Sequence, residues 1–178
     1  GCYNDCAQRH YKCGEDSYIN TMNSELSEFD SFFSVASYFG QQVHPLGDTN
    51  GDTYGDILVT APNWTTGDYT NKGRIFIFKG SASGLETSAA STVLGQDDND
   101  YFGQNVLTGR DINADGHDDI VVTAPYRDSN GTDSGSMYVY FGSAAGISTS
   151  AANNIPGTED GAKFGEVIDW AGDVNGDG

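Results

Sequence analysis

Short apolar runs alternate with turn-forming stretches along most of this chain. Arg74-Ile-Phe-Ile-Phe-Lys79 is the strongest strand signal because it is rich in β-branched and aromatic residues, and Ser136-Met-Tyr-Val-Tyr-Phe141 is its copy. Two further runs, at residues 57–62 and 120–125, have the composition of buried strands. The pattern therefore predicts an all-β chain that contains repeated units.

The apolar pattern of the first unit predicts four strands, at about residues 41–46, 56–61, 74–79 and 92–94. In the second unit the third strand covers residues 136–141, and a short edge strand falls near residues 154–155. Consecutive strands joined by short turns form an antiparallel meander, and such sheets arranged radially form a propeller. In a meander, the first and third connections lie at one end of the sheet and the second connection lies at the other.

A polar loop leads into each of the runs at 57–62 and 120–125. Asp111-Ile-Asn-Ala-Asp-Gly-His-Asp-Asp119 has oxygen-bearing side chains at loop positions 1, 3, 5 and 9 and glycine at position 6. Asp48-Thr-Asn-Gly-Asp-Thr-Tyr-Gly-Asp56 repeats the pattern, and Asp173-Val-Asn-Gly-Asp-Gly178 begins it again. Oxygen ligands on a bent loop favour a hard cation of calcium size. The alternative is an acidic surface turn, because Asp, Asn and Gly favour turns without any metal.

The candidate ligands occupy positions 1, 3, 5, 7 and 9, with position 7 contributing its backbone carbonyl. An EF-hand is excluded because its bidentate Glu at position 12 is replaced by Val59 and Val122, so the Asp at position 9 is expected to take that role. A dockerin-type loop stays conceivable for the third copy. The candidates are Asp48, Asn50, Asp52, Tyr54 and Asp56; Asp111, Asn113, Asp115, His117 and Asp119; and Asp173, Asn175 and Asp177.

Several different sequence motifs recur along the chain with the same spacing. The three loops begin 63 and 62 residues apart, and Phe39-Gly40, Phe102-Gly103 and Phe164-Gly165 precede them in the same register. Gly80-Ser-Ala-Ser-Gly-Leu85 recurs 62 residues later as Gly142-Ser-Ala-Ala-Gly-Ile147. A shared period of this length identifies a repeat protein.

Phe-Gly, then Asp-x-Asn-x-Asp-(Gly)-x-x-Asp, then Ala-Pro resembles the FG-GAP repeat of integrin α-subunit β-propellers, over about residues 38–178. The resemblance implies one four-stranded blade per repeat, with calcium in the hairpin between the first two strands. It departs at Thr53, where glycine is absent from position 6 and Gly51 and Gly55 are expected to supply the bend. The expected organisation is an N-terminal segment at 1–37, repeats at 38–100 and 101–163, and the start of a third at 164–178.

The chain has a formal net charge of −18, with 26 acidic and 8 basic residues. This balance excludes a general nucleic-acid or anionic-membrane surface. No stretch is long and apolar enough to span a bilayer. No signal peptide is visible, so the sequence is expected to begin as a mature or excised piece.

Residues 1–37 do not share the repeat and contain Cys2, Cys6 and Cys13. Zinc is disfavoured because a fourth ligand is lacking, so an extracellular segment with at least one disulfide is expected, free thiols being the alternative. Residues 24–33 could form a helix with Leu26, Phe29 and Phe33 on one face, or residues 32–35 could form a strand. Asn63-Trp-Thr65 and Asn130-Gly-Thr132 match the N-glycosylation pattern, and Asn63 and Asn130 are either glycosylated or ordinary turn residues.

No nucleophile, metalloprotease or phosphate-loop motif is present, so no enzymatic activity is expected. Trp64 and Tyr69 could contact a sugar or a protein, although a buried or merely exposed aromatic is the better interpretation. We predict an extracellular, calcium-binding propeller module for adhesion or for binding a protein or glycan ligand. The alternatives are a structural subunit completed by copies of itself in an assembly, and an accessory domain of a secreted enzyme. Open blade faces would expose apolar strand residues, so the chain alone is expected to aggregate, to self-associate, or to need further sequence or a partner chain that supplies the missing strands.

Overall fold

The structure is a computed structural model that describes residues 37–65 and 70–172, all within a unit of Val35–Gly178. The described residues form β-strands and turns and contain no helix, which confirms the all-β prediction for this part of the chain. Several sequence predictions fall outside the described residues and stay predictions. They concern Cys2, Cys6, Cys13, the segment 24–33, Tyr69, Asp173, Asn175 and Asp177.

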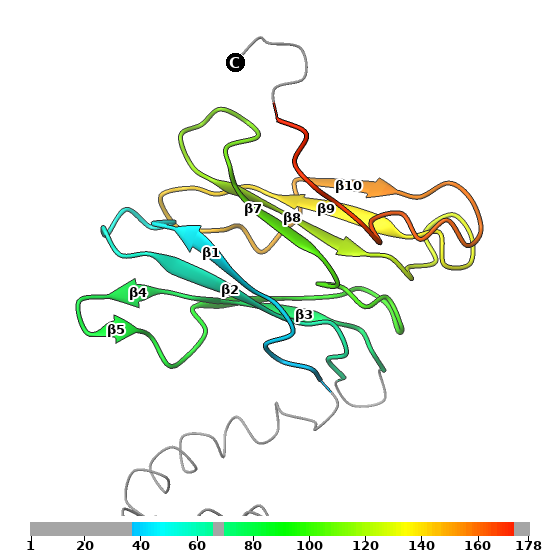
Figure 1. Ribbon diagram of the computed structural model, residues 1–178, viewed down its shortest axis with the longest axis horizontal. Helices are drawn as coiled ribbons and strands as arrows, with labels where there is room; N and C mark the ends of the chain where they lie inside the picture. Colours follow the sequence, from blue (N-terminus) through cyan, green and yellow to red (C-terminus); the bar gives the residue numbers. More distant parts are fainter. Residues whose placement is uncertain (1–36, 66–69, 173–178) are drawn as a thin grey trace, which may run out of the picture. The chain divides into compact units, whose positions relative to one another are not determined.

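Two four-stranded antiparallel sheets follow one another along the chain (Figure 1). Their strand orders are β1-β2-β3-β6 and β7-β8-β9-β10, so each is the meander that the sequence predicts. The first sheet contains β1 (Val43–Gly47), β2 (Asp56–Ala61), β3 (Arg74–Phe78) and β6 (Ser91–Leu94). The second contains β7 (Val106–Arg110), β8 (Asp119–Ala124), β9 (Ser136–Tyr140) and β10 (Asn153–Pro156).

The connection between β3 and β6 contains a small hairpin that the sequence analysis did not predict. Its strands are β4 (Gly80–Ser81) and β5 (Gly84–Leu85), which lie within the first Gly-Ser-x-x-Gly turn. Gly84 has a φ of +108°, which glycine adopts without steric cost. The hairpin projects at the same end of the sheet as the β1–β2 loop, as expected for a meander (Figure 1).

One hydrophobic core joins the two sheets. Side chains alternate across a strand, so every second residue of β2 and β3 points to the second sheet, and the facing residues of β8 and β9 point back. Phe102, between the sheets in sequence, is 2% exposed and contacts the rings of Tyr138 and Tyr140 edge-on. The core contains Leu46, Leu58, Ile75, Ile77, Val93, Phe102, Val106, Ile120, Val122, Ala124, Tyr138, Tyr140 and Ile147.

On the central strands β2, β3, β8 and β9, the faces opposite this core are also buried, which corrects for these strands the expectation that their apolar residues would be exposed. On the first sheet, Trp64 packs edge-on against Phe76 at 5.3 Å and Phe39 does so at 5.0 Å. Trp64 is 2% exposed and is therefore a core residue, as the preferred interpretation held. On the second sheet, Val121 and Val139 are buried as well. Val43 on β1, at 58% exposure, does meet the expectation.

The Phe-Gly pairs connect one sheet to the next repeat. Gly73 and Gly135 form isolated parallel bridges with Phe102 and Phe164 respectively. A Cβ atom on Gly73 would lie 2.1 Å from the Phe102 carbonyl oxygen, so only glycine permits this approach. The described residues thus form two neighbouring four-stranded blades, an incomplete set for a β-propeller.

Candidate cation-binding loops

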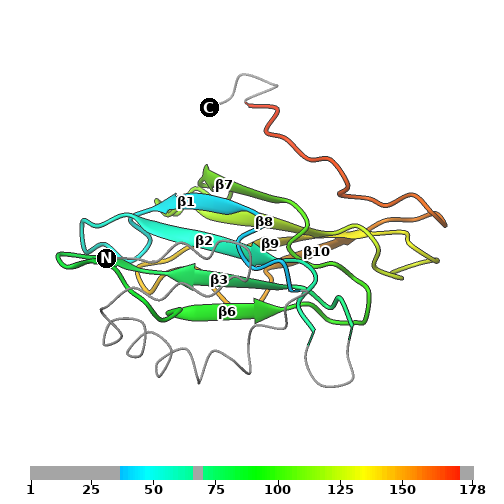
Figure 2. The same cartoon turned by 60° about the horizontal axis from the view of Figure 1, so that its bottom comes forward.

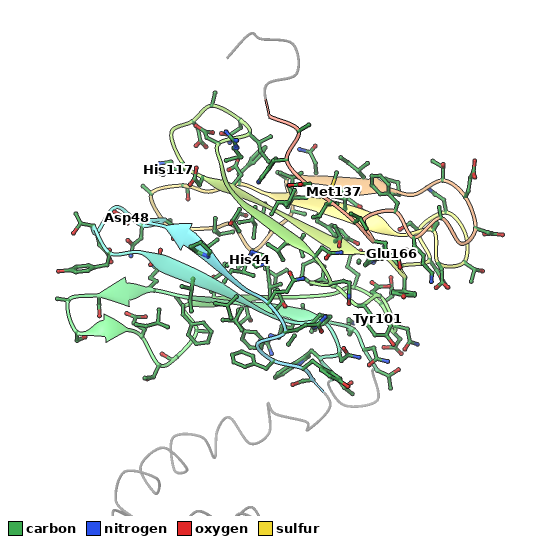
Figure 3. The ribbon with its side chains drawn as sticks, in the orientation of Figure 1. His44, Asp48, Tyr101, His117, Met137 and Glu166 are labelled. Carbon is green, nitrogen blue, oxygen red and sulfur yellow. The ribbon has the colours of Figure 1, made fainter. Side chains whose placement is uncertain are left out.

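The two candidate loops connect β1 to β2 and β7 to β8, and they lie at the same end of the two sheets. Figure 3 shows Asp48 and His117, one from each loop, at this end, whereas Tyr101 and Glu166 lie at the other. The strands that flank each loop are paired antiparallel, with a register shift in β1 and in β7 as the chain enters the loop. The hairpin therefore fixes where each loop begins and ends.

The Asp at position 1 organises the backbone of each loop. Asp48 Oδ1 accepts hydrogen bonds from the N–H groups of Gly51 (2.7 Å) and Asp52 (3.0 Å), and its Oδ2 accepts one from Thr53 (2.7 Å). These backbone N–H bonds, that of Thr53 first, lower the pKa of the Asp48 carboxyl. Because they favour the charged form, the loop stabilises a negative charge at its first position.

The second loop has the same hydrogen bonds with one fewer donor. Asp111 Oδ1 accepts from the Asp115 N–H (3.1 Å), and Asp111 Oδ2 accepts from the Gly116 N–H (2.7 Å). The side chains at positions 3 and 5 are also linked, because Asn113 Nδ2 donates to Asp115 Oδ2 at 2.8 Å. The corresponding Asn50–Asp52 bond has the same length, so both loops hold these side chains in the same way.

The Asp at position 9 is buried in both loops and ties the loop to the rest of the blade. Asp56 is 1% exposed; its Oδ2 accepts from the Thr49 N–H (3.1 Å) and hydroxyl, and its Oδ1 accepts from the Gly80 N–H (2.9 Å). Asp119 is fully buried and makes the equivalent bonds with the N–H groups of Ile112 (2.8 Å) and Gly142 (2.8 Å). Each carboxylate therefore joins its loop to the Gly-Ser-x-x-Gly turn.

Gly80 and Gly142 are site residues that the sequence analysis did not assign. A Cβ on Gly80 would lie 2.3 Å from the Gly55 carbonyl oxygen, and one on Gly142 would lie 2.2 Å from that of Asp118. Glycine is thus required for the turn to approach the loop. The signal was present, because this turn recurs with the same 62-residue step as the loops.

Both loops have left-handed backbone at positions 4 and 6. Gly51 and Thr53 have φ values of +77° and +76°, and Ala114 and Gly116 have values of +60° and +91°. The expectation that Gly51 bends the first loop is met. The same expectation for Gly55 is wrong, because Thr53 rather than Gly55 adopts the second left-handed conformation. A β-branched residue rarely does so, and the cost is offset by the hydrogen bond from its N–H to Asp48.

The donor set suits a hard cation, because every candidate atom is a carboxylate, amide or carbonyl oxygen. Among the described residues, no three acidic, histidine or cysteine side chains converge closely enough to hold a metal by themselves. The carboxylates at positions 1 and 5 instead accept N–H bonds within the loop, and the carboxylate at position 9 accepts one from the loop and one from the Gly-Ser-x-x-Gly turn. Since a carboxylate has about four lone-pair sites, these bonds leave acceptor capacity for a cation. The residues of each loop therefore fit calcium by chemistry.

The two glycosylation patterns lie in the β2–β3 and β8–β9 connections. Asn63 is half-buried and its Nδ2 donates to Asn71 Oδ1 (3.2 Å), whereas Asn130 is exposed and its Nδ2 donates to the Gly157 carbonyl (3.0 Å). In a meander these connections lie at the end opposite the cation loops. No helix within the described residues has the length and hydropathy needed to cross a membrane.

Comparison with known proteins identifies the repeats. Residues 39–78 and 102–140 match the FG-GAP repeat family. The chain is 31% identical to integrin alpha-4 of Xenopus laevis over 148 residues, which is 81% of this chain and 14% of that protein. It is 28% identical to integrin alpha-2 of Bos taurus over 176 residues, covering 94% of the chain and 14% of that protein.

A third relative, integrin alpha-6 of Gallus gallus, is 34% identical over 130 residues, which is 73% of this chain and 12% of that protein. The chain therefore spans a small part of the length of these curated relatives. The family match covers the first three strands of each blade and both loops, and the observed sheets have the strand order expected of such repeats. This chain belongs to the FG-GAP repeat proteins, and its described residues form an all-β, integrin α-like β-propeller segment.

Proposed function

We propose that this chain is part of an extracellular adhesion or ligand-binding module in which each loop binds one calcium ion. Asp48, Asn50, Asp52 and Asp56, with the Tyr54 carbonyl, would hold the first ion. Asp111, Asn113, Asp115, Asp119 and the His117 carbonyl would hold the second, and a third loop begins at Asp173, Asn175 and Asp177. Calcium neutralises the carboxylates that each loop brings together and makes the hairpin rigid.

One observation carries this proposal: in both loops the side-chain oxygens at positions 3 and 5 accept the same backbone N–H bonds, although the loop sequences differ at positions 2, 4, 6, 7 and 8. The residues that stay the same are those with candidate ligand side chains. Asn50 accepts from the Asp52 N–H at 3.1 Å, and Asn113 accepts from the Asp115 N–H at 3.0 Å. A solvated turn would need no such match between distant loops.

Similarity to integrin α-subunits supports a role in adhesion, with a protein or glycan ligand and a location outside the cell or at its surface. The high acidity of the chain is consistent with calcium loading, and no nucleic-acid or membrane-inserting role is proposed for this segment. We further propose a disulfide-bearing segment at 1–37 and glycans on Asn63 and Asn130. Thiol counting under denaturing conditions and glycosidase digestion with mass analysis test these two features.

The calcium proposal is tested by thermal unfolding with increasing calcium and in excess chelator. Extracellular modules of this kind bind calcium at about 10⁻⁴ to 10⁻³ M, so the melting temperature is expected to rise across millimolar concentrations. Asp115→Asn should remove most of the rise contributed by the second loop. The matched control is Asp118→Asn, which changes an exposed carboxylate at position 8 of the same loop. An unchanged melting temperature in chelator would refute calcium binding.

A further inference from the structure

The described residues contain two Asn-Gly pairs, Asn50-Gly51 in the first cation loop and Asn130-Gly131 in the β8–β9 connection. In such a pair the backbone nitrogen of the glycine can reach the side-chain carbonyl carbon of the asparagine with little obstruction, because glycine has no Cβ. A third pair, Asn175-Gly176, lies outside the described residues. The structure places the two described pairs in different surroundings.

At Asn50-Gly51 both groups that would react are held by hydrogen bonds. The Gly51 N–H donates to Asp48 Oδ1 at 2.7 Å. The Asn50 side chain accepts from the Asp52 N–H (3.1 Å) through Oδ1 and donates to Asp52 Oδ2 (2.8 Å) through Nδ2. Hydrogen bonds to an ionised carboxylate are the strong ones, so the loop keeps the glycine nitrogen away from the asparagine side chain.

At Asn130-Gly131 the glycine nitrogen is not held in this way. Asn130 is exposed, and the Gly131 N–H donates no hydrogen bond to any residue in the part of the chain that the structure describes. The Asn130 side chain makes one hydrogen bond, from Nδ2 to the Gly157 carbonyl (3.0 Å). This connection lies beside the turn that follows β10, at the end of the second sheet opposite the cation loops (Figure 2).

Packing favours glycine at position 131. A Cβ there would lie 2.1 Å from Asp160 Oδ1, and this oxygen accepts a hydrogen bond from the Thr132 N–H at 2.9 Å. A side chain at position 131 would therefore displace the Asp160 carboxylate from its donor. The contact keeps beside Asn130 the one residue that obstructs attack on its side chain least.

We propose that Asn130 is a site of spontaneous deamidation. The Gly131 nitrogen attacks Cγ of Asn130 and forms a new C–N bond. The Cγ–Nδ2 bond breaks, and Nδ2 leaves as ammonia with the proton from the Gly131 nitrogen, so a cyclic succinimide remains. Water then adds to one of the two ring carbonyls and opens the ring to aspartate or isoaspartate. Neither step needs an oxidant, a reductant or a cofactor.

The reaction changes both the contacts and the possible modification of this turn. A carboxylate at position 130 has no donor for the Gly157 carbonyl, and it adds a negative charge to a turn that Asp160 already contacts. The Nδ2 atom that leaves is also the atom that would carry an N-linked glycan. Glycosylation and deamidation of Asn130 therefore exclude each other.

The test follows each Asn-Gly peptide over time by mass spectrometry, in the calcium-loaded chain produced without N-glycosylation. Reaction at Asn50 first requires loss of the hydrogen bond from Gly51 to a carboxylate, so Asn130 should convert roughly 10- to 150-fold faster. In the denatured chain these hydrogen bonds are absent, and the two pairs should convert at similar rates. Equal rates in the folded chain, or an Asn130 that stays intact while the denatured chain converts, would overturn the proposal.

Two variants test the site and its consequence. Asn130→Gln lengthens the side chain by one carbon and should abolish conversion of this peptide while Asn50 is unaffected. Asn130→Asp reproduces one product and should speed hydrogen exchange of the Gly161 N–H, which donates to the Thr132 carbonyl at 2.7 Å. Asn154→Asp is the matched control, because it adds the same charge at an exposed position on β10 and should leave this exchange unchanged. Conversion that survives Asn130→Gln contradicts the site, and unchanged exchange in Asn130→Asp contradicts the consequence.

Discussion

The first and second cation loops adopt the same backbone with glycine at opposite positions. Both are left-handed at positions 4 and 6, but the first loop has glycine at position 4 and threonine at 6, whereas the second has alanine at 4 and glycine at 6. Each loop therefore relieves one of its two strained positions and keeps the other. The common feature is the set of hydrogen bonds to the first aspartate, which indicates that these bonds rather than glycine determine the shape.

The same two repeats differ at the residue that follows Ala-Pro-x. In the first repeat Trp64 lies in an aromatic cluster, with the Arg74 guanidinium 5.2 Å from its ring centroid. In the second repeat Arg127 takes the equivalent backbone position and pairs with Asp97 (3.1 Å) and Asp100 (3.0 Å). The backbone N–H bonds Trp64 to Ala61 and Arg127 to Ala124 match. A fixed turn thus accepts either an apolar or an ionic side chain.

The largest expected effect on stability comes from substituting the glycines that form backbone bridges with the phenylalanine of each Phe-Gly pair. Gly73→Ala would place a Cβ against the Phe102 backbone at a φ of +82°, and we expect a loss of about 3 kcal/mol in unfolding free energy. Gly135→Ala should cost less, because its partner Phe164 is 38% exposed and can move more readily. Denaturant unfolding measures both losses. Gly55→Ala, which meets open space, is the control, and equal losses for all three would contradict this account.

The next largest effect concerns the buried aspartates. Asp56→Asn or Asp119→Asn replaces an acceptor by an NH₂ group facing an N–H donor, and we expect each to cost about 2 kcal/mol of unfolding free energy in chelator. Asp56 should be the more sensitive, because the Thr49 hydroxyl also donates to it whereas Ile112 has only its N–H. Denaturant unfolding of the two variants beside Asp118→Asn checks the order. A larger loss at Asp119 would show that the hydroxyl contributes nothing.

Exchanging the glycines tests the comparison of the loops directly. Thr53→Gly and Ala114→Gly relieve left-handed strain and should each raise the unfolding free energy by about 0.5–1 kcal/mol, with the larger gain at the β-branched Thr53. Gly51→Ala and Gly116→Ala should lower it by about 1 kcal/mol. Thermal unfolding of the four variants beside the unmodified chain measures these gains and losses in stability. A loss of stability in Thr53→Gly would mean that the threonine side chain, rather than the backbone, holds the loop.

The smallest effect is a pH dependence from Asp48. Its folded-state pKa is lowered, mainly by the Thr53 N–H, so its contribution to stability is present above the unfolded value of 3.8 and is lost as pH falls through the folded value. Acid titration of stability in chelator should therefore be less steep for Asp48→Asn than for the unmodified chain. Identical acid slopes would show that these N–H bonds do not favour the charged form in solution.

The strand order and the loops were predictable from sequence because both depend on local signals. The apolar runs at Arg74–Phe78 and Ser136–Tyr140 are strands as expected, and the repeated Asp-x-Asn-x-Asp pattern marks the hairpins. Close backbone approaches were not predictable in this way. Gly73 meets Phe102, and Gly80 meets Gly55, across long stretches of chain, and one sequence does not show which glycine a distant backbone will touch.

The conformation of Thr53 was missed for a different reason. Steric rules disfavour a left-handed threonine, so the bend was assigned to the neighbouring glycines, whereas the N–H bond to Asp48 holds Thr53 in that conformation. The burial of Val121 and Val139 was missed because a strand pattern does not specify what packs over its outer face. Asn63 and Asn130 both match the N-glycosylation pattern, so the sequence did not show that Asn130 is exposed and Asn63 half-buried.

The Phe102-Gly103 pair has a consequence for how such repeats can be copied. The Phe102 N–H donates to the Lys72 carbonyl of the preceding repeat (3.3 Å), whereas the adjacent Gly103 N–H donates to the Thr123 carbonyl of its own repeat (2.9 Å). Two neighbouring residues thus belong to different blades. A gene duplication copies one repeat as a block. Such a block carries at one boundary the glycine that the next repeat's phenylalanine approaches, and at the other boundary the phenylalanine that approaches the glycine of the preceding repeat. Each boundary between tandem copies therefore has both of its residues only when a whole repeat has been copied, which favours growth of the array by whole repeats.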